Sequence, residues 1–218
     1  MSSLSLWRAL LMVAALLLCI PPAAGEGGAV CTATGDAGAG DPTQPMAGVV
    51  PAGKRTKAGL YLSAVDAGPM IERFKEKVLF VDVRTRGELM FAGMPTLVDV
   101  HVPFMFDPDG GRFDADRGSF VLVVNPDFVA RIDRALAAKG LTRADPVVLI
   151  CQAGIRAAKA ADTLTDAGFA QPWAIVDGFE GDPAPDGSGN GLRTVNGWRN
   201  SGLAWTTKLD AAKMYGPN

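Results

Sequence analysis

The stretch Asp145-Pro-Val-Val-Leu-Ile-Cys151-Gln-Ala-Gly154-Ile-Arg156 decides how the rest of the chain is interpreted. Residues 147–150 form a short apolar run rich in β-branched side chains, which is typical of a buried strand in a parallel sheet. Residues 157–167 predict a helix with one apolar face, and Gly168 follows as a stop signal. The stretch therefore predicts a strand, a loop of six residues and a helix, in that order.

The loop between this strand and this helix carries the candidate chemistry. Cys151 stands at the carboxyl end of the strand, the edge at which open α/β sheets bind ligands. The helix N-terminus directs N–H groups and a partial positive charge at the sulfur, which favours a thiolate nucleophile. Gly154 permits a positive φ, so the loop can curl around the sulfur, and Arg156 adds a full positive charge. None of the residues after the cysteine is proline, so each offers a backbone N–H to a substrate: Gln152, Ala153, Gly154, Ile155 and Arg156.

This loop resembles the active-site loop of the rhodanese family, Cys-x-x-Gly-x-Arg between a strand and a helix. Further segments match the family in order: Val78-Leu-Phe-Val-Asp82-Val-Arg84-Thr-Arg-Gly-Glu88, Val100-His-Val-Pro103 and Gly197-Trp198-Arg-Asn-Ser-Gly202-Leu. The resemblance implies one α/β domain with a mainly parallel, five-stranded sheet and helices on both faces. It also implies sulfur transfer through a persulfide on Cys151, without a cofactor.

In the rhodanese pattern, Asp82 and Arg84 lie near the catalytic loop and support it. We expect Asp82 to hold backbone N–H groups of the loop or of its neighbours. The family usually has Gly-His-Ile-Pro-Gly next, whereas residues 93–97 here contain no histidine. His101 lies in a predicted strand over residues 98–102, and we expect it to serve packing and hydrogen bonding and not catalysis.

Two further helices are predicted, one before and one after the strand over residues 98–102. The first opens at Ser63, and its apolar residues Val65, Ile71 and Phe74 are expected on the buried side. The second follows Asn125-Pro126-Asp127, where proline suits the first helical position. Its apolar stripe has a spacing of four residues and consists of Phe128, Ile132 and Leu136.

Two segments have no counterpart in the family. Residues 107–119 are polar and contain several aspartates, but their spacing lacks the final glutamate of an EF-hand loop, so we expect a solvated loop and no calcium site. Residues 182–191 are rich in glycine and are expected to be flexible. Two interpretations of this second insertion stay open, one as a gate at the mouth of the active site and one as an addition without a function.

Composition excludes several classes of function. The formal net charge of −2 gives no reason to expect nucleic acid or an anionic membrane surface as a partner. The chain has one histidine and no Cys-x-x-Cys pair, so no zinc or haem site is expected.

The N-terminus predicts export. Residues 1–25 resemble a signal peptide, with Arg8 followed by an apolar run over residues 9–20 and then small residues. An uncleaved anchor is the alternative, although the run is short for a membrane span. Residues 26–58 predict a flexible Gly/Ala/Pro-rich arm, residues 59–210 the rhodanese-like domain and residues 211–218 a tail. Export to a bacterial periplasm would leave Cys31 on the arm and Cys151, which either form a disulfide or stay apart.

Three functions remain open. The first is a sulfurtransferase that takes sulfane sulfur from a small donor (thiosulfate, a persulfide or a mercapto-acid) and passes it to a thiol or cyanide. The second is a non-enzymatic persulfide carrier or docking module whose partner is a protein thiol or persulfide of a periplasmic sulfur-oxidation or maturation system. The third is a cysteine-dependent phosphatase. Phosphatase relatives have five residues between cysteine and arginine, whereas this loop has four.

Overall fold

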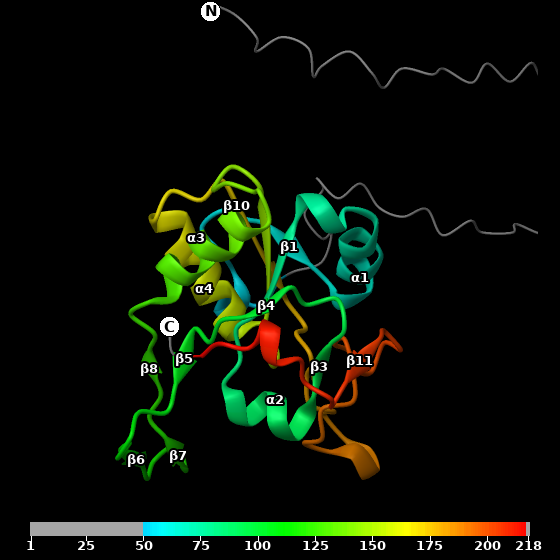
Figure 1. Ribbon diagram of the computed structural model, residues 1–218. Coiled ribbons are helices and arrows are strands. Elements are labelled where there is room, and N and C mark those ends of the chain that lie inside the picture. Colours follow the sequence, from blue (N-terminus) through cyan, green and yellow to red (C-terminus); the bar gives the residue numbers. More distant parts are fainter. Residues whose placement is uncertain (1–49, 217–218) are drawn as a thin grey trace, which may run out of the picture. The chain divides into compact units, whose positions relative to one another are not determined.

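The computed structural model describes residues 50–216 (Figure 1). The expected leader, most of the expected arm and Cys31 lie outside the described residues. The helices are α1 (Ala64–Arg73), α2 (Arg86–Ala92), α3 (Phe128–Ala138) and α4 (Ile155–Asp166), with 3-10 turns η1 (Ala52–Lys54), η2 (Lys75–Lys77), η3 (Gly187–Gly189) and η4 (Ala211–Lys213). The strands are β1 (Tyr61–Leu62), β2 (Leu79–Asp82), β3 (Met94–Pro95), β4 (Val100–His101), β5 (Met105–Phe106), β6 (Phe113–Asp114), β7 (Ser119–Phe120), β8 (Val123–Val124), β9 (Pro146–Ile150), β10 (Gln171–Ile175) and β11 (Trp205–Thr206).

A five-stranded sheet forms the centre of the domain. Its strand order is β1-β10-β9-β2-β4, and every neighbouring pair is parallel. Residues 147–150 of β9 are buried because β9 is the middle strand and both of its faces are covered. The carboxyl ends of β9 and β2 lie in register, with Ile150 opposite Asp82. Cys151 and the residues after Asp82 therefore leave the sheet at the same edge.

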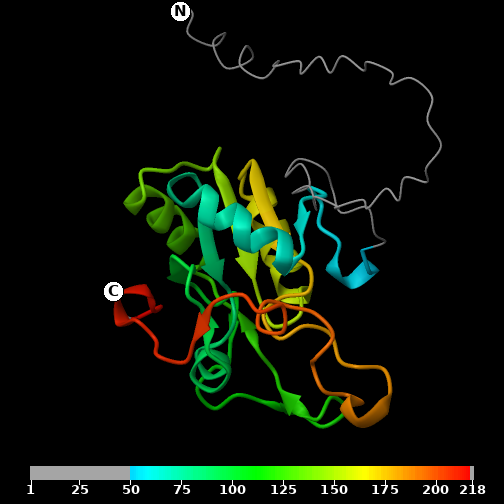
Figure 2. The same ribbon diagram turned by 90° about the vertical axis from the view of Figure 1, so that its right-hand side faces the viewer.

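Two apolar clusters cover the two faces of this sheet. On one face, α3 and α4 pack against side chains that include Leu79, Val81 and Leu149. On the other face, α1 and α2 pack with Trp198 against side chains that include Phe80 and Val148. In Figure 1, α3 and α4 lie to the left of the sheet and α1 to the right, and Figure 2 shows the same layers after a quarter turn. The predicted α/β fold with helices on both faces of a parallel five-stranded sheet is confirmed.

The predicted helix faces were right for α3 and wrong in part for α1. Phe128, Ile132 and Leu136 of α3 are all buried, as their spacing indicated. In α1, Ile71 is buried, but Val65 is 56% exposed and Phe74, which caps the helix, is 37% exposed. The buried residues of α1 are mostly small: Ala64, Ala67, Gly68 and Ile71.

A hairpin arm (residues 105–124) replaces the expected solvated loop over residues 107–119. Strand β5 pairs with β8, and β6 pairs with β7, each in antiparallel fashion. The segment is exposed, as expected for a polar insertion, but its backbone is paired. Phe113 and Phe120 face each other across β6 and β7 in an edge-to-face contact. Figure 1 shows this arm at the lower left, where it extends away from the sheet.

Residues 182–191 were expected to be flexible, but they also have local structure. They contain η3, and isolated bridges join Pro183 to Arg193 and Ala184 to Asn190. Asp182 forms an ion pair of 2.7 Å with Lys54. In Figure 1 this segment is orange and lies on the opposite side of the lower part of the domain from the hairpin arm.

The two ends of the described chain contact the domain. At one end, Lys57 forms an ion pair with Asp166 of α4. At the other end, the C-terminal segment (residues 205–216) begins with β11, which pairs with β3, and ends where Tyr215 packs against the α3–α4 cluster. Between residues 50 and 216, no helix has the length and apolar character needed to span a membrane.

Candidate active site

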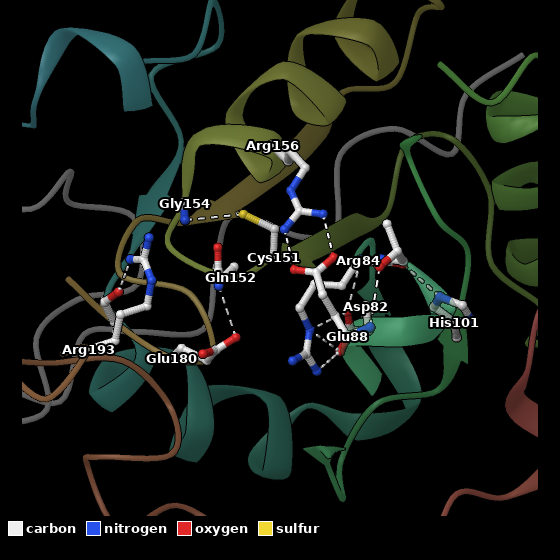
Figure 3. A network of polar contacts seen from close by, with 12 residues as sticks. Asp82, Arg84, Glu88, His101, Cys151, Gln152, Gly154, Arg156, Glu180 and Arg193 are labelled. Carbon is white, nitrogen blue, oxygen red and sulfur yellow. Dashed lines mark hydrogen bonds and ion pairs between the residues drawn. The ribbon is translucent and has the colours of Figure 1, made fainter. Parts of the chain in front are cut away.

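Cys151 lies directly after β9 and is 1% exposed. The N–H of Gly154 donates a hydrogen bond to its sulfur, with a distance of 3.1 Å between N and Sγ. Gly154 has a φ of +93°, which turns the loop back toward the sulfur just before α4 begins at Ile155. Figure 3 shows the loop curled around Sγ, with this hydrogen bond drawn as a dashed line. The predicted arrangement of strand, curled loop and helix is present.

The segment after β10 fixes the loop through backbone hydrogen bonds. Phe179 N–H donates to Cys151 O at 2.8 Å, and Glu180 N–H donates to Gln152 O at 2.9 Å. The side chain of Gln152 also donates to Glu180, at 3.2 Å. Gly154 approaches the backbone so closely that a Cβ at this position would lie 2.1 Å from Val176 O. The loop conformation is therefore fixed by β10 and by the chain after it.

The six loop residues differ in what they present to solvent. Gln152, Ala153 and Arg156 are half-buried, Gly154 is buried, and Ile155 is 50% exposed. The Ile155 side chain is therefore accessible to solvent, unlike the buried sulfur. Arg156 interacts electrostatically with Cys151, so the structure brings the predicted nucleophile and the predicted cation of the loop together.

Arg156 forms a two-pronged ion pair with Glu88 of α2. Its Nη1 lies 2.6 Å from Glu88 Oε2, and its Nη2 contacts Oε1. Burial alone would raise the pKa of Glu88, but the hydrogen bond and the charge of Arg156 outweigh it and hold this pKa below its usual value. Glu88 is therefore ionised at neutral pH, and it neutralises the one cation of the loop.

Glu88 also caps α2. Thr85 and Glu88 form a reciprocal capping box, in which Thr85 N–H donates to Glu88 at 2.9 Å and Glu88 N–H donates to Thr85. The same carboxylate thus starts a helix and pairs with the loop. Glu88 ends one of the segments that match the family, but its pairing with Arg156 was not predicted from the sequence. The two partners are 68 residues apart, so no local signal reveals it.

Asp82 and Arg84 form a fully buried ion pair beside the loop. Both side chains are 0% exposed, and Arg84 Nη2 lies 2.6 Å from Asp82 Oδ2. Asp82 accepts the neighbouring backbone N–H of Arg84 at 3.0 Å, and Arg84 donates to Gly93 O and stacks on the Phe179 ring. Asp82 therefore holds a neighbouring N–H group, one of the two roles expected for it. The pair joins β2 to Gly93 and to Phe179 under the loop.

His101 belongs to this supporting network. It is fully buried, and its Nε2 lies 2.8 Å from Arg84 O, which requires Nε2 to carry the proton. Burial lowers the pKa of His101 below its ordinary value. In Figure 3, His101 lies to the right of Arg84, on the side away from Cys151. Packing and hydrogen bonding, as expected, describe what this side chain does.

A pocket of about 860 Å³ opens next to the loop. Gln152 and Arg156 contribute from the loop, and Glu88 contributes from α2. The remaining lining comes from the start of α2, the hairpin arm and the C-terminal segment: Thr85, Arg86, Gly87, Pro103, Phe106, Asp107, Ser119, Phe120, Leu122 and Tyr215. The hairpin arm therefore borders the pocket, whereas the lining includes none of the described side chains of the 182–191 segment. One of the two interpretations of residues 182–191 was a gate at the mouth of the active site, and the lining of this pocket does not support it.

No cluster of three or more histidine, cysteine, aspartate or glutamate side chains suited to a metal ion occurs within residues 50–216. The candidate site is thus a buried thiol that accepts a hydrogen bond from the N–H of Gly154, and a guanidinium paired with Glu88, beside a pocket lined by apolar and polar side chains.

No family model matches this sequence, and no curated protein matches it either. Solved structures with a similar course of the chain include Rv0390 from M. tuberculosis, which has 28% sequence identity, covers 68% of this chain and 97% of its own and gives a TM-score of 0.49. They also include a polysulfide-sulfur transferase homodimer from Wolinella succinogenes, with 22% identity, coverage of 67% of this chain and 77% of its own and a TM-score of 0.37.

Proposed function

We propose that this protein is a sulfurtransferase in which Cys151 accepts sulfane sulfur as a persulfide and passes it to a thiol or to cyanide. The observation that carries the proposal is the hydrogen bond of 3.1 Å from Gly154 N–H to Cys151 Sγ, inside a loop of six residues at the N-terminus of α4. Backbone N–H groups that converge on one sulfur stabilise a thiolate and then the terminal sulfur of a persulfide.

The chemistry needs two steps and no cofactor. In the first, the Cys151 thiolate attacks the sulfur that is to be transferred, and the bond that joins this sulfur to the rest of the donor breaks. This bond is a sulfur–sulfur bond in thiosulfate or a persulfide and a carbon–sulfur bond in a mercapto-acid, and the remainder of the donor leaves with the electron pair. In the second, the acceptor attacks the outer sulfur of the Cys151 persulfide and regenerates the thiolate. The kinetics should therefore be ping-pong.

Mass spectrometry of Cys151 tests the proposal directly. After incubation with thiosulfate, an organic persulfide or a mercapto-acid, the peptide that contains Cys151 should carry one additional sulfur atom. Cys151→Ser should abolish sulfur transfer and leave the free energy of unfolding almost unchanged, because a buried thiol and a hydroxyl differ little in volume. Full transfer activity in this variant, or a Cys151 peptide that never gains sulfur from any donor, would contradict the mechanism.

A phosphatase is the second candidate function, and the position of Asp107 in the pocket favours it. A phosphatase of this type needs a general acid for the leaving oxygen, and Asp107 lines the same pocket as Arg156. Two observations oppose it. The loop has four residues between Cys151 and Arg156, which leaves a narrow ring of donors for three phosphoryl oxygens, and Glu88 neutralises the guanidinium that would bind a dianion. Release of phosphate from an aryl phosphate that depends on Cys151, without persulfide formation, would favour the phosphatase.

The persulfide carrier remains a distinct version of the same chemistry. It would form the same Cys151 persulfide but deliver sulfur to a protein partner. Slow turnover with small acceptors and fast turnover with a protein thiol would favour it. Cleavage of the leader and a periplasmic location belong to this proposal as well, and N-terminal sequencing of protein from the periplasmic fraction tests them.

A further inference from the structure

The charges around the pocket cancel. Two cations, Arg86 and Arg156, and two carboxylates, Glu88 and Asp107, line it. Arg156 is committed to Glu88 through both of its terminal nitrogens. Arg86 donates through Nε and Nη2 to the backbone oxygen of Tyr215, at 3.2 and 2.7 Å. A doubly charged anion that enters this pocket therefore meets no net positive charge and no guanidinium free of a partner among these residues.

Separation of the Glu88–Arg156 ion pair is also energetically costly. The Glu88 and Arg156 side chains are only 22% and 17% exposed, so each would be left partly buried and unpaired if a ligand separated them. Glu88 accepts from Thr85 N–H as well, which fixes the carboxylate at the start of α2. A substrate must bind beside the intact pair.

The shape and lining of the pocket suit an organic group. Its volume of about 860 Å³ is far larger than an inorganic sulfur oxyanion requires and is in the range of sites for organic ligands. One wall is apolar, formed by Phe106, Phe120 and Leu122 of the hairpin arm. This wall can bury carbon atoms of a donor while its sulfur end reaches the loop.

From these observations we infer that Glu88 determines donor specificity: by neutralising Arg156 it disfavours thiosulfate and selects organic sulfane-sulfur donors with a single negative charge, such as an amino-acid persulfide. The inference rests on the proposed sulfurtransferase function. The step is Cys151–S⁻ + R–S–SH → Cys151–S–SH + R–S⁻, in which one S–S bond breaks, one forms, and the thiolate of the donor leaves with the electron pair.

Two donors that differ by one charge provide the test. Thiosulfate carries two negative charges and releases sulfite, whereas the methanethiosulfonate anion, CH₃–SO₂–S⁻, carries one and releases methanesulfinate. The measured quantity is the second-order rate constant for persulfide formation on Cys151, followed by rapid quenching and mass spectrometry. The ratio of the thiosulfate constant to the methanethiosulfonate constant is compared between variants, so the intrinsic reactivity of each donor cancels.

Glu88→Gln is the informative variant. Glutamine retains the capping box of α2 but removes the charge, so Arg156 becomes a free cation. The ratio should rise at least about tenfold, the size of one charge–charge interaction near a protein surface. The rise should shrink at high ionic strength, because salt screens the freed cation. Glu72→Gln is the matched control, because Glu72 is exposed on α1 and the substitution makes the same change in net charge; its ratio should equal that of the unmodified protein.

Arg156→Gln makes an independent prediction of opposite sign. It leaves Glu88 without its cation, so the ratio should fall below that of the unmodified protein, and this variant decides the matter if Glu88→Gln does not fold. Ratios within twofold of the unmodified protein in the variants that fold would overturn the inference while leaving sulfur transfer intact. If the unmodified protein forms no Cys151 persulfide from either anion or from cysteine persulfide, the proposed function itself fails, and the inference falls with it.

Discussion

His101 makes the network of Asp82 and Arg84, which lies beside the loop, sensitive to pH. It is the only histidine in the chain, and burial lowers its pKa below the ordinary value of about 6.5. Its Nε2 donates to Arg84 O, and its buried Nδ1 has no hydrogen-bond partner. Protonation would place a second N–H in a site that offers it no acceptor.

This arrangement predicts that the protein loses stability as the pH falls through the ordinary pKa of histidine. Because the folded pKa is lowered, the unfolded chain binds the proton first, so the free energy of unfolding should decrease from about pH 7.5 to about pH 5.5. Urea denaturation at a series of pH values measures it. Carboxylates titrate mostly below this window, so His101→Gln should flatten the slope. An equally steep slope in that variant would assign the effect to other groups.

The buried pair of Asp82 and Arg84 should serve stability and not chemistry. Asp82→Ala leaves a fully buried guanidinium without its carboxylate and should cost about 3–5 kcal/mol of unfolding free energy. The double variant Asp82→Ala, Arg84→Met removes the stranded charge and should recover part of this loss. Urea denaturation of the single and double variants measures both. A loss below about 1 kcal/mol in the single variant would show that the pair does not hold the domain together.

At the scale of elements, the loop over residues 151–156 depends on one backbone conformation. Gly154 has a φ of +93°, and its backbone passes so close to Val176 O that no Cβ fits. The same residue supplies the N–H that contacts the sulfur. Displacement of this loop would therefore move the donor away from Cys151 and strain its packing on β10.

Gly154→Ala should reduce sulfur transfer about a hundredfold or more, because a displacement of about 1 Å at reacting groups has costs of that size. It should also destabilise the protein. Gly168→Ala is the matched control: Gly168 also has a positive φ, of +86°, but a Cβ there would meet nothing within 4 Å. The control should lose about 1–2 kcal/mol of stability from the left-handed conformation and keep its activity. Equal activity losses in both variants would contradict a specific role for the loop geometry.

The elements that could be predicted from the sequence are those with strong, repeated local signals. The buried β-branched runs of β2 and β9 and the stripe of α3 give such signals. The buried face of α1 was not predicted correctly because close packing favours small residues: a Cβ on Gly68 would lie 2.8 Å from Leu203. Val65 lies off the face that Ala64, Gly68 and Ile71 share, so the helix periodicity directs it to solvent.

The candidate site, like the fold, could be predicted only in part from the sequence. The position of Cys151 and the curl at Gly154 follow from a strand, a glycine and a helix that are adjacent in sequence. The pairing of Arg156 with Glu88 and the wall formed by the hairpin arm do not, because they join segments far apart in the chain. Sequence patterns predicted the geometry of the loop, but the charge balance of the pocket depends on tertiary structure.

At the scale of the whole domain, the C-terminal segment joins the two layers. Leu209 and Met214 pack against the α1–α2 cluster, whereas Tyr215 packs against the α3–α4 cluster. Lys213 donates to Val98 O at 2.7 Å, beside the sheet. The residues from 211 onward were expected to form a tail, but the described ones make these contacts, and Tyr215 also lines the pocket.

Tyr215 should therefore stabilise the domain and shape the pocket. Its ring lies 4.7 Å from the guanidinium carbon of Arg131 and 5.6 Å from that of Arg86. Tyr215→Ala should cost about 1–3 kcal/mol of unfolding free energy, from the lost apolar burial and the two cation–π contacts. It should also raise KM for an organic donor, because one wall of the pocket is removed. Urea denaturation and donor titration measure the two effects.

Tyr215→Phe provides the control that separates the ring from its hydroxyl group. The hydroxyl makes one long contact, 3.5 Å from Asn125 Oδ1, so its loss should change stability by less than about 0.5 kcal/mol. Phenylalanine keeps the ring against both arginines and should keep KM as well. If Tyr215→Ala were as stable as Tyr215→Phe and bound donors equally well, the segment would be a tail after all, and the pocket would owe its shape to the hairpin arm and α2 alone.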